Sequence, residues 1–179
     1  MRADVWSTLC QMMEDWGVSP PIAADVDEQG RGWGVNEEGT RAMLVYVVKP
    51  GEKEGGVLSE VQSALGDDMP AETRRAVVVV QGAAKLARLR RIPNVQVWDA
   101  ADLRVNLARH QLVPACRALS HAEAEALFRL VPKTSLQPLP RSDLVVRYHG
   151  FVAGQVVQFT RQTELGRDTK YRVVTDTFY

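Results

Sequence analysis

The apolar residues near the start of the chain follow the spacing of an amphipathic helix. They recur three or four residues apart, at Val5, Leu9, Met12, Met13 and Trp16, and so fall on one helix face. Gly17 and the Ser-Pro-Pro sequence at 19–21 end the pattern, because proline cannot continue a helix. We expect a first helix whose Met and Trp side chains pack in a core.

Unbroken apolar runs follow at 42–48, 76–80 and 95–98, and such runs are typical of strands covered on both faces. Between them, helical spacing predicts one helix over 57–65, ended by Gly66, and another over 83–92, ended by Pro93. This alternation predicts a three-layer α/β domain with a partly parallel sheet and right-handed crossovers. Leu103, Val105 and Leu107 alternate with polar residues and predict a further, half-buried strand.

In residues 22–40, apolar residues follow neither the spacing of a helix nor the alternation of a strand. This segment is rich in Gly, Asp and Glu. The run Gly-Arg-Gly-Trp-Gly at 30–34 has the glycine content of a phosphate-binding loop. Such a loop needs a strand before it and a helix after it, and neither is predicted here. We interpret the segment as a flexible loop.

The C-terminal third of the chain predicts a small α+β domain. Ser120 and Glu123 form a capping box that opens a helix through Leu130, and prolines 132, 138 and 140 keep the next segment extended. Asp143 caps a short helix that ends at Gly150 in a left-handed conformation. Gly154 then starts a hairpin with strands over 156–159 and 171–174 and a polar loop over 162–170.

Composition narrows the classes of function. The 179 residues suffice for one large or two small domains, and 22 Lys and Arg balance 22 Asp and Glu. A protein that binds DNA on its own usually has a basic excess, so a role inside a larger complex fits better. We expect no membrane span and no signal peptide. Cys10 and Cys116 form no Cys-x-x-Cys pair, and both thiols are expected free in a reducing compartment.

No catalytic or metal site is predicted. Cys116 lies near two histidines in sequence, but it follows Pro114 in what we interpret as a linker, with no activating motif. Two cysteines and three dispersed histidines make a poor zinc site. The Glu-Lys-Glu sequence at 52–54 is reminiscent of metal-dependent nucleases, but no suitably placed aspartate precedes it on a strand.

One predicted helix has a basic face. Lys85, Arg88 and Arg91 lie three residues apart, opposite Leu86 and Leu89. A basic face of this kind can follow a phosphate backbone without reading bases. These three residues are our DNA-proximal candidates, and an ordinary solvated face is the alternative.

Residues 139–172 carry an ordered set that is more specific than any short catalytic motif. The set is Leu139, Pro140, Arg141, Asp143, Val145, Arg147, Tyr148, Gly150, Gly154, Gln155, Val156, Val157, Arg161, Gly166, Tyr171 and Arg172. It resembles the C-terminal domain of the fifth subunit shared by the eukaryotic nuclear RNA polymerases I, II and III, a family that has an archaeal counterpart. The segment 110–114 resembles the family's linker between its two domains, and 78–81 resembles an N-terminal strand of the family.

The chain departs from the family pattern in four places, one of which is that no tyrosine follows Gly166 closely, since Asp168 intervenes. Leu144 stands where the family has proline, and the spacer before Asp143 is shorter than usual. Gln81 is not followed by the Thr-Pro-Ser-Ala turn that lies near downstream DNA in the family. A DNA contact by that turn is therefore not expected here.

The resemblance implies an N-terminal α/β jaw domain over 1–110 and a C-terminal α+β assembly domain over 111–179. It implies a non-catalytic subunit of a multisubunit DNA-directed RNA polymerase, which helps to hold downstream double-stranded DNA and docks on the largest subunit. No cofactor, metal, membrane or small-molecule substrate is implied. The docking residues that it implies are Arg141, Arg147, Tyr148, Gly150, Gln155, Arg161, Tyr171 and Arg172.

The compact first domain is compatible with a reduced eukaryotic subunit or a viral homologue. The expected location is the nucleus for a cellular protein, and the virion or the host cytoplasm or nucleus for a viral one. A free-standing nuclease-like DNA-binding protein built on the α/β domain is the alternative function. The zero net charge and the missing set of carboxylates count against that alternative.

Overall fold

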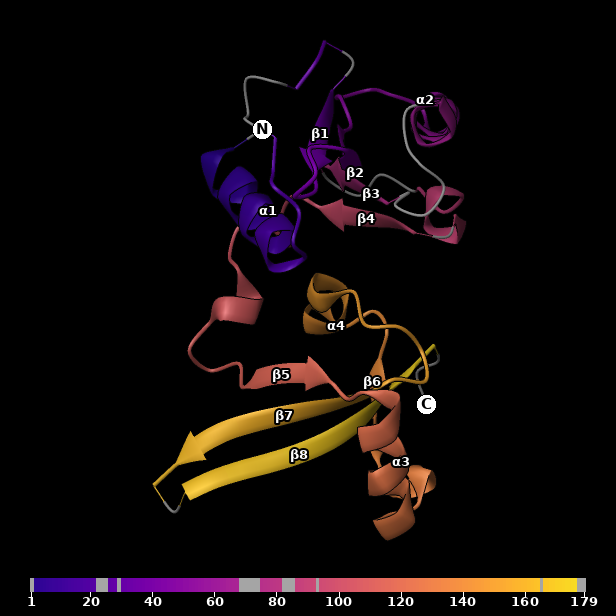
Figure 1. The fold of residues 1–179 in the computed structure, drawn as a ribbon. Coiled ribbons are helices and arrows are strands. Elements are labelled where there is room, and N and C mark those ends of the chain that lie inside the picture. Colours follow the sequence, from indigo (N-terminus) through magenta and orange to yellow (C-terminus); the bar gives the residue numbers. More distant parts are fainter. Residues whose placement is uncertain are drawn as a thin grey trace. The chain divides into compact units, whose positions relative to one another are not determined.

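The computed structural model describes residues 2–21, 26–28, 30–67, 75–81, 86–92, 94–164 and 166–176. The chain divides into two compact units, Met1–Asn106 and Leu107–Tyr179 (Figure 1). The division predicted from the sequence lies between residues 110 and 111. Among the described residues, no helix has both the length and the apolar character needed to cross a membrane.

The first unit contains a mixed four-stranded sheet in the order β1-β2-β3-β4. Its strands are β1 Arg31–Val35, β2 Arg41–Val47, β3 Ala76–Val80 and β4 Val95–Asp99. β1 pairs with β2 in the antiparallel sense, whereas β2, β3 and β4 are parallel. The prediction of a partly parallel sheet is confirmed.

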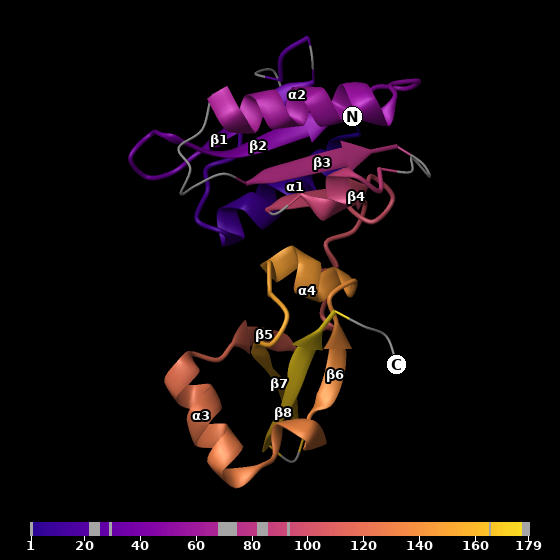
Figure 2. The ribbon, with the colours of Figure 1, turned by 90° about the vertical axis from the view of Figure 1, so that its right-hand side faces the viewer.

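Two helices cover opposite faces of this sheet, α1 Ala3–Asp15 and α2 Glu54–Asp67 (Figure 2). On one face, Val57 and Val61 of α2 lie in the same core cluster as Leu44 and Tyr46 of β2. Alternate strand residues such as Met43 point to the other face, and the apolar stripe of α1 is likewise buried. The three-layer architecture is confirmed, although α2 continues past Gly66 to residue 67.

Residues 31–35 form the strand β1, so the loop interpretation was wrong for this part of 22–40, whereas 22–25 and 29 lie outside the described residues. Gly34 pairs with Met43, and a Cβ at Gly34 would lie 2.4 Å from Cε of Met13 in α1. A Cβ at Gly32 would lie 3.1 Å from Cγ of Pro21. These glycines let neighbouring segments pack closely against β1.

The helix predicted over 83–92 is also wrong where the structure describes it. Leu86 and Leu89 are buried, but residues 89–91 form only a single 3₁₀ turn, η2 Leu89–Arg91. Ile92 is extended because the following proline disfavours the helical conformation, and Asn94 has a φ of 63°. The rest of the predicted helix, including Lys85, lies outside the described residues.

The strand predicted around residues 103–107 is absent. Leu103 is buried, but Val105 is 57% exposed and Leu107 begins a 3₁₀ turn, η3 Leu107–Arg109. Local turns replace strand pairing, since the N–H of Asp102 donates to the Asp99 carbonyl at 3.0 Å. Of the three alternating apolar residues, only Leu103 is therefore buried, and the three do not form one face of a strand.

The second unit is built on a four-stranded sheet in the order β5-β7-β8-β6. Its strands are β5 Ala115–Ala118, β6 Gln137–Pro140, β7 Val156–Thr163 and β8 Gly166–Thr175. β5 is antiparallel to β7, β7 is antiparallel to β8, and β6 is parallel to β8. Because β5 and β6 flank only one end of the β7–β8 hairpin, its other end continues as a two-stranded ribbon (Figure 1).

Two helices and three of their caps were predicted correctly in this unit. Asp143 accepts hydrogen bonds from the N–H groups of Val145 and Val146, at 2.8 and 3.4 Å, and so caps α4 Leu144–His149. Gly150 ends α4 with a φ of 68°. α3 His121–Leu130 begins at the predicted capping box, and a further 3₁₀ turn, η4 Lys133–Ser135, follows it. The small core consists of Leu139, Val146, Val157 and Val174.

The hairpin loop predicted over 162–170 is wrong in extent. The strands pair as far as Thr163 and Gly166, so only residues 164 and 165 connect them. The polar side chains of this stretch reflect exposure of the ribbon rather than loss of strand structure. Cys116 likewise lies on β5 rather than in a linker, and Gly154, with a φ of 89°, belongs to the turn before β7.

The capping box of α3 makes stability depend on pH. The Arg117 guanidinium donates two hydrogen bonds to Glu123, at 2.7 and 3.0 Å, and the N–H of Ser120 donates a third at 2.8 Å. These bonds, that of Arg117 first, lower the pKa of Glu123 from 4.5 to about 2. Since the folded pKa lies below the unfolded one, the ionised carboxylate stabilises the fold above about pH 4.5.

This contribution is expected to disappear as the pH falls from about 4.5 to about 2. Glu123→Gln should therefore make the melting temperature, measured by circular dichroism, depend less on pH in that window. Glu164→Gln, which removes an exposed carboxylate of the same unit, is the control. An unchanged pH dependence in Glu123→Gln would contradict the assignment.

Candidate partner-docking surface

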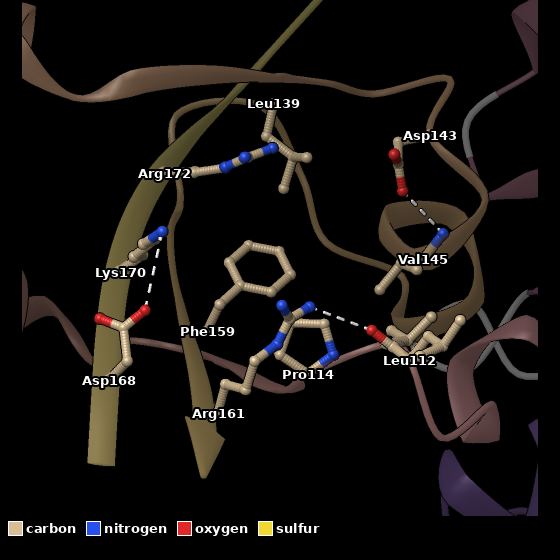
Figure 3. Close-up of a pocket in the computed structure, with 11 residues that line it drawn as sticks. Leu112, Pro114, Leu139, Asp143, Val145, Phe159, Arg161, Asp168, Lys170 and Arg172 are labelled. Atoms are coloured by element: carbon tan, nitrogen blue, oxygen red, sulfur yellow. Dashed lines mark hydrogen bonds and ion pairs between the residues drawn. The ribbon is translucent and has the colours of Figure 1, made fainter. Parts of the chain in front are cut away.

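A pocket of about 420 Å³ lies on one face of the second unit (Figure 3). The hairpin register explains its composition, because Phe159 lies opposite Lys170 and Arg161 opposite Asp168, which brings alternate residues of both strands to the same face. Leu139 of β6, the first turn of α4 and the segment 112–114 close the pocket. The floor is apolar and the walls are mainly basic.

The charges around this pocket are unevenly matched. Asp168 pairs with Lys170 at 3.6 Å, and the Asp143 carboxylate accepts from the first turn of α4. Arg161 donates to the backbone carbonyl of Leu112 at 3.1 Å, and the Arg172 guanidinium lies 5.8 Å from the centre of the Phe159 ring. In the part of the chain that the structure describes, neither arginine has a carboxylate partner within 4 Å.

The neighbouring thiol is poorly suited to nucleophilic chemistry. Cys116 packs beside the small core of this unit. Burial, followed by the negative charge of Asp143, raises the pKa of Cys116 to about 11. The thiol is therefore protonated near neutral pH, whereas the nucleophile in cysteine chemistry is the thiolate.

The predicted docking residues do not form one cluster. Arg161 and Arg172 line the pocket, whereas Tyr171 points to the opposite face of β8, because adjacent strand residues alternate. Arg141 is exposed and pairs with Asp176 at 3.3 Å. Arg147 is half-buried on α4.

Three other predicted docking residues have structural roles. Tyr148 is 4% exposed, so its ring is buried and is not presented to a partner. Gly150 provides the left-handed end of α4. The side-chain oxygen of Gln155 accepts from the N–H of Val152 at 2.9 Å and closes the turn before β7. Their place in the sequence motif is explained by the fold.

The sequence interpretation missed the apolar part of the pocket. Phe159, Leu139 and Val145 form its centre, and Lys170 and Asp168 complete its wall. In the hairpin register, residues 157, 159 and 161 lie opposite 172, 170 and 168 on the same face of the sheet. Knowledge of this register would have identified the pocket face. Recognising it required the hairpin register, which the predicted long loop obscured.

In the first unit, the basic candidates lie on a turn instead of a helix. The candidates Arg88 and Arg91 are exposed around η2, and so is Arg90, which was not among the candidates. Among the described residues, no carboxylate pairs with their guanidinium groups, although the backbone N–H of Arg88 donates to Glu54 at 2.7 Å. The turn therefore presents three guanidinium groups to solvent.

The Glu-Lys-Glu sequence at 52–54 has a structural role. Glu52 accepts a hydrogen bond from the Tyr46 hydroxyl at 2.7 Å and another from the N–H of Lys49 at 3.0 Å. Burial, followed by the Glu52 carboxylate, raises the pKa of Tyr46. Glu54 accepts from the backbone of Arg88. Both carboxylates hold turns together, which gives the nuclease alternative no support.

Comparisons with known proteins agree with the architecture of the second unit. A family model described as RNA polymerase Rpb5, C-terminal domain, matches residues 105–174. A Dictyostelium discoideum relative, the DNA-directed RNA polymerases I, II, and III subunit rpabc1, is 30% identical over 141 residues, covering 72% of this chain and 71% of the relative.

Two further relatives are similar over shorter stretches. The Arabidopsis thaliana DNA-directed RNA polymerases IV and V subunit 5B is 34% identical over 83 residues, or 45% of this chain and 38% of the relative. The Caenorhabditis elegans DNA-directed RNA polymerases I, II, and III subunit RPABC1 is 35% identical over 109 residues, or 56% and 52% of the two chains.

The two-unit fold and these similarities define a non-catalytic subunit of a DNA-directed RNA polymerase. The chain is 30% identical to the Dictyostelium relative and spans 71% of its length. It therefore belongs to the RNA polymerase Rpb5 family, and the family identified from the sequence motif is confirmed.

Proposed function

We propose that the second unit docks this chain on the largest subunit of a multisubunit RNA polymerase, and that the first unit lies in the jaw near downstream DNA. The observation that carries the proposal is the family match over residues 105–174, which coincides with the unit that holds the pocket. Arginine is enriched where proteins dock, and Arg161 and Arg172 at this pocket have no carboxylate partner among the described residues.

Affinity purification of the tagged full chain from its own cells tests the docking proposal. The largest polymerase subunit should co-purify in equimolar amount, because a constitutive subunit remains bound through the isolation. Mass spectrometry of the eluate measures the ratio. A chain that elutes alone, under salt conditions in which the polymerase stays intact, would contradict the proposal.

The exposed arginines of η2 support a weak contact with the DNA backbone in the jaw. Arg88, Arg90 and Arg91 offer at most three phosphate contacts. Arg88 and Arg91 are candidates from the sequence, as is Lys85, whereas Arg90 is added here because its side chain is exposed beside them. Each neutralised phosphate releases roughly one counterion, so the slope of log affinity against log salt changes by about one per contact. Such a contact is too weak to hold DNA alone but contributes inside a complex that already holds the duplex.

The Arg88→Glu, Arg90→Glu, Arg91→Glu triple variant should assemble normally and lower the salt concentration at which elongation complexes dissociate. The buried residues Leu86 and Leu89 are unchanged, so the fold should survive. Lys53→Glu, exposed in the same unit, is the control and should have little effect. Unchanged salt tolerance in the triple variant would identify an ordinary solvated turn.

The proposed location is the nucleus. Relatives such as the Dictyostelium subunit are named as components of polymerases I, II and III, which supports a role in nuclear transcription. Fluorescence microscopy of the tagged chain tests this location. A virion or a cytoplasmic site of viral replication stays a prediction from the compact first domain.

A further inference from the structure

The pocket of the second unit lies beside an unpaired strand edge. β6 pairs with β8 only from Gln137, opposite Arg172, toward the C-terminal end of β8. From Gly166 to Tyr171, β8 has no neighbouring strand on the side away from β7 among the described residues. The hairpin ladder fixes which backbone groups face this side.

The backbone N–H and C=O groups that point away from β7 belong to the odd-numbered residues of β8. The N–H of Val174 donates to the Gln155 carbonyl, toward β7, whereas the Thr175 carbonyl accepts from Arg141 on the β6 side. The register between β7 and β8 is continuous from Val173 to Gly166. Arg167, Thr169 and Tyr171 therefore present N–H or C=O groups to the open edge.

The even-numbered residues of the same stretch lie on the pocket face. Asp168, Lys170 and Arg172 line the pocket together with Phe159 and Arg161 from β7 (Figure 3). Because Lys170 and Asp168 pair with each other, the remaining positive charge is that of Arg161 and Arg172. A strand added at the open edge would place every second side chain over this face.

We propose that an extended segment of a partner polymerase subunit pairs with β8 between Arg167 and Tyr171. On the pocket face, this segment carries an acidic side chain that binds Arg161 or Arg172 and an apolar side chain that contacts Phe159. The backbone edge supplies affinity and the pocket supplies specificity, as in other strand-addition complexes. The inference rests on the proposed docking function and specifies its chemistry.

An unpaired edge is also found in proteins that bind nothing there, because charged residues and prolines prevent strand addition. On this side of the sheet, β6 covers the C-terminal end of β8 and carries Pro138 and Pro140. The open stretch of β8 carries charged residues at 167, 168 and 170 but no proline, and it adjoins a pocket of about 420 Å³ with an apolar floor. The two edges therefore differ in their capacity to accept a strand.

Thr169→Pro in the full chain tests the edge directly. Proline removes the outward N–H at position 169 and leaves the bonds between β7 and β8 intact, since edge strands tolerate proline on their open side. Polymerase recovered on the tagged chain should fall at least about tenfold. Thr169→Val keeps the N–H and is the matched control, expected to bind as the unchanged chain does. Circular dichroism confirms that both variants are folded.

Arg161→Glu combined with Arg172→Glu tests the charge of the pocket. This pair should also lower recovery at least about tenfold, whereas Arg129→Glu, at an exposed position of α3 in the same unit, should change it less than about twofold. A photo-crosslinking residue at position 170 should then mark an extended acidic and apolar segment of a polymerase subunit. A crosslink to DNA or to a basic segment would overturn the inference.

The outcomes separate this inference from the docking proposal. If the unchanged chain recovers no polymerase, the docking proposal itself is wrong. If the unchanged chain recovers polymerase and folded Thr169→Pro and Arg161→Glu, Arg172→Glu variants recover the same amount, docking uses another surface. In that case the open edge of β8 is only a solvated, charged strand.

Discussion

A fragment comprising residues 107–179 is expected to fold without residues 1–106 and to be retained by the polymerase. It contains a complete four-stranded sheet, both helices of the second unit and the core formed by Leu139, Val146, Val157 and Val174. Many domains of this size fold alone. Circular dichroism should show a cooperative thermal transition, and the tagged fragment should recover the largest subunit.

Two aspartate variants make this expectation specific. Val146 is fully buried, so Val146→Asp leaves a carboxylate without partners in the core, at a cost of several kcal/mol, comparable with the whole stability of a small domain. Val152 is 52% exposed, and Val152→Asp should be nearly neutral. The first variant should be unfolded and lose the polymerase, and the second should keep both properties. A soluble fragment that is unfolded without any substitution would contradict the prediction.

Elements with local signals were predictable from the sequence. Asp143 caps the start of α4 with its side chain, and Gly150 ends α4 in a left-handed conformation. Ser120 and Glu123 form the capping box at the start of α3. The buried strand β3 was equally clear, because all five of its residues are apolar and buried. Each of these signals depends on neighbours in the sequence.

Elements defined by distant neighbours were missed. β1 contains the sequence Gly-Trp-Gly at 32–34, which carries no strand signal of its own. Its strand structure depends on pairing with β2 and on close packing against α1. The ribbon end of the hairpin is polar on both faces, so no alternation marks it as a strand. The helix predicted at 83–92 was wrong because a local signal was present but ambiguous. The spacing of Leu86 and Leu89 fits a helix, but it fits equally well a turn that buries both side chains.

The candidate docking surface was only half predictable for the same reason. The sequence motif identified Arg161 and Arg172, which share a face, but it also included Tyr171, which points away, and Tyr148, which is buried. A sequence motif of this kind contains two groups of residues: those that stabilise the fold and those that contact a partner. Separating the two groups requires the register of the hairpin and the exposure of each side chain.

Gly34→Val is expected to destabilise the first unit by about 3 kcal/mol. A Cβ at this position would lie 2.4 Å from Cε of Met13 and 2.6 Å from Cγ1 of Val18. Met13 is fully buried, and Val18 precedes Ser19, which exchanges two backbone hydrogen bonds with Val35. The flexible end of Met13 can turn aside, but the β-branched side chain of Val18 cannot, so the backbone around Val18 must shift away from β1.

Urea unfolding of the full chain, followed by tryptophan fluorescence, measures this loss in the first unit alone, since all four tryptophans lie at positions 6, 16, 33 and 98. Gly56→Ala is the matched control: its Cβ meets no atom within 4 Å, and it lies in α2, where alanine is favoured by up to about 1 kcal/mol. If docking depends on the second unit, polymerase recovery should be the same for Gly34→Val as for the unchanged chain. Unchanged unfolding of Gly34→Val would mean that Val18 packs against β1 less closely than the structure indicates.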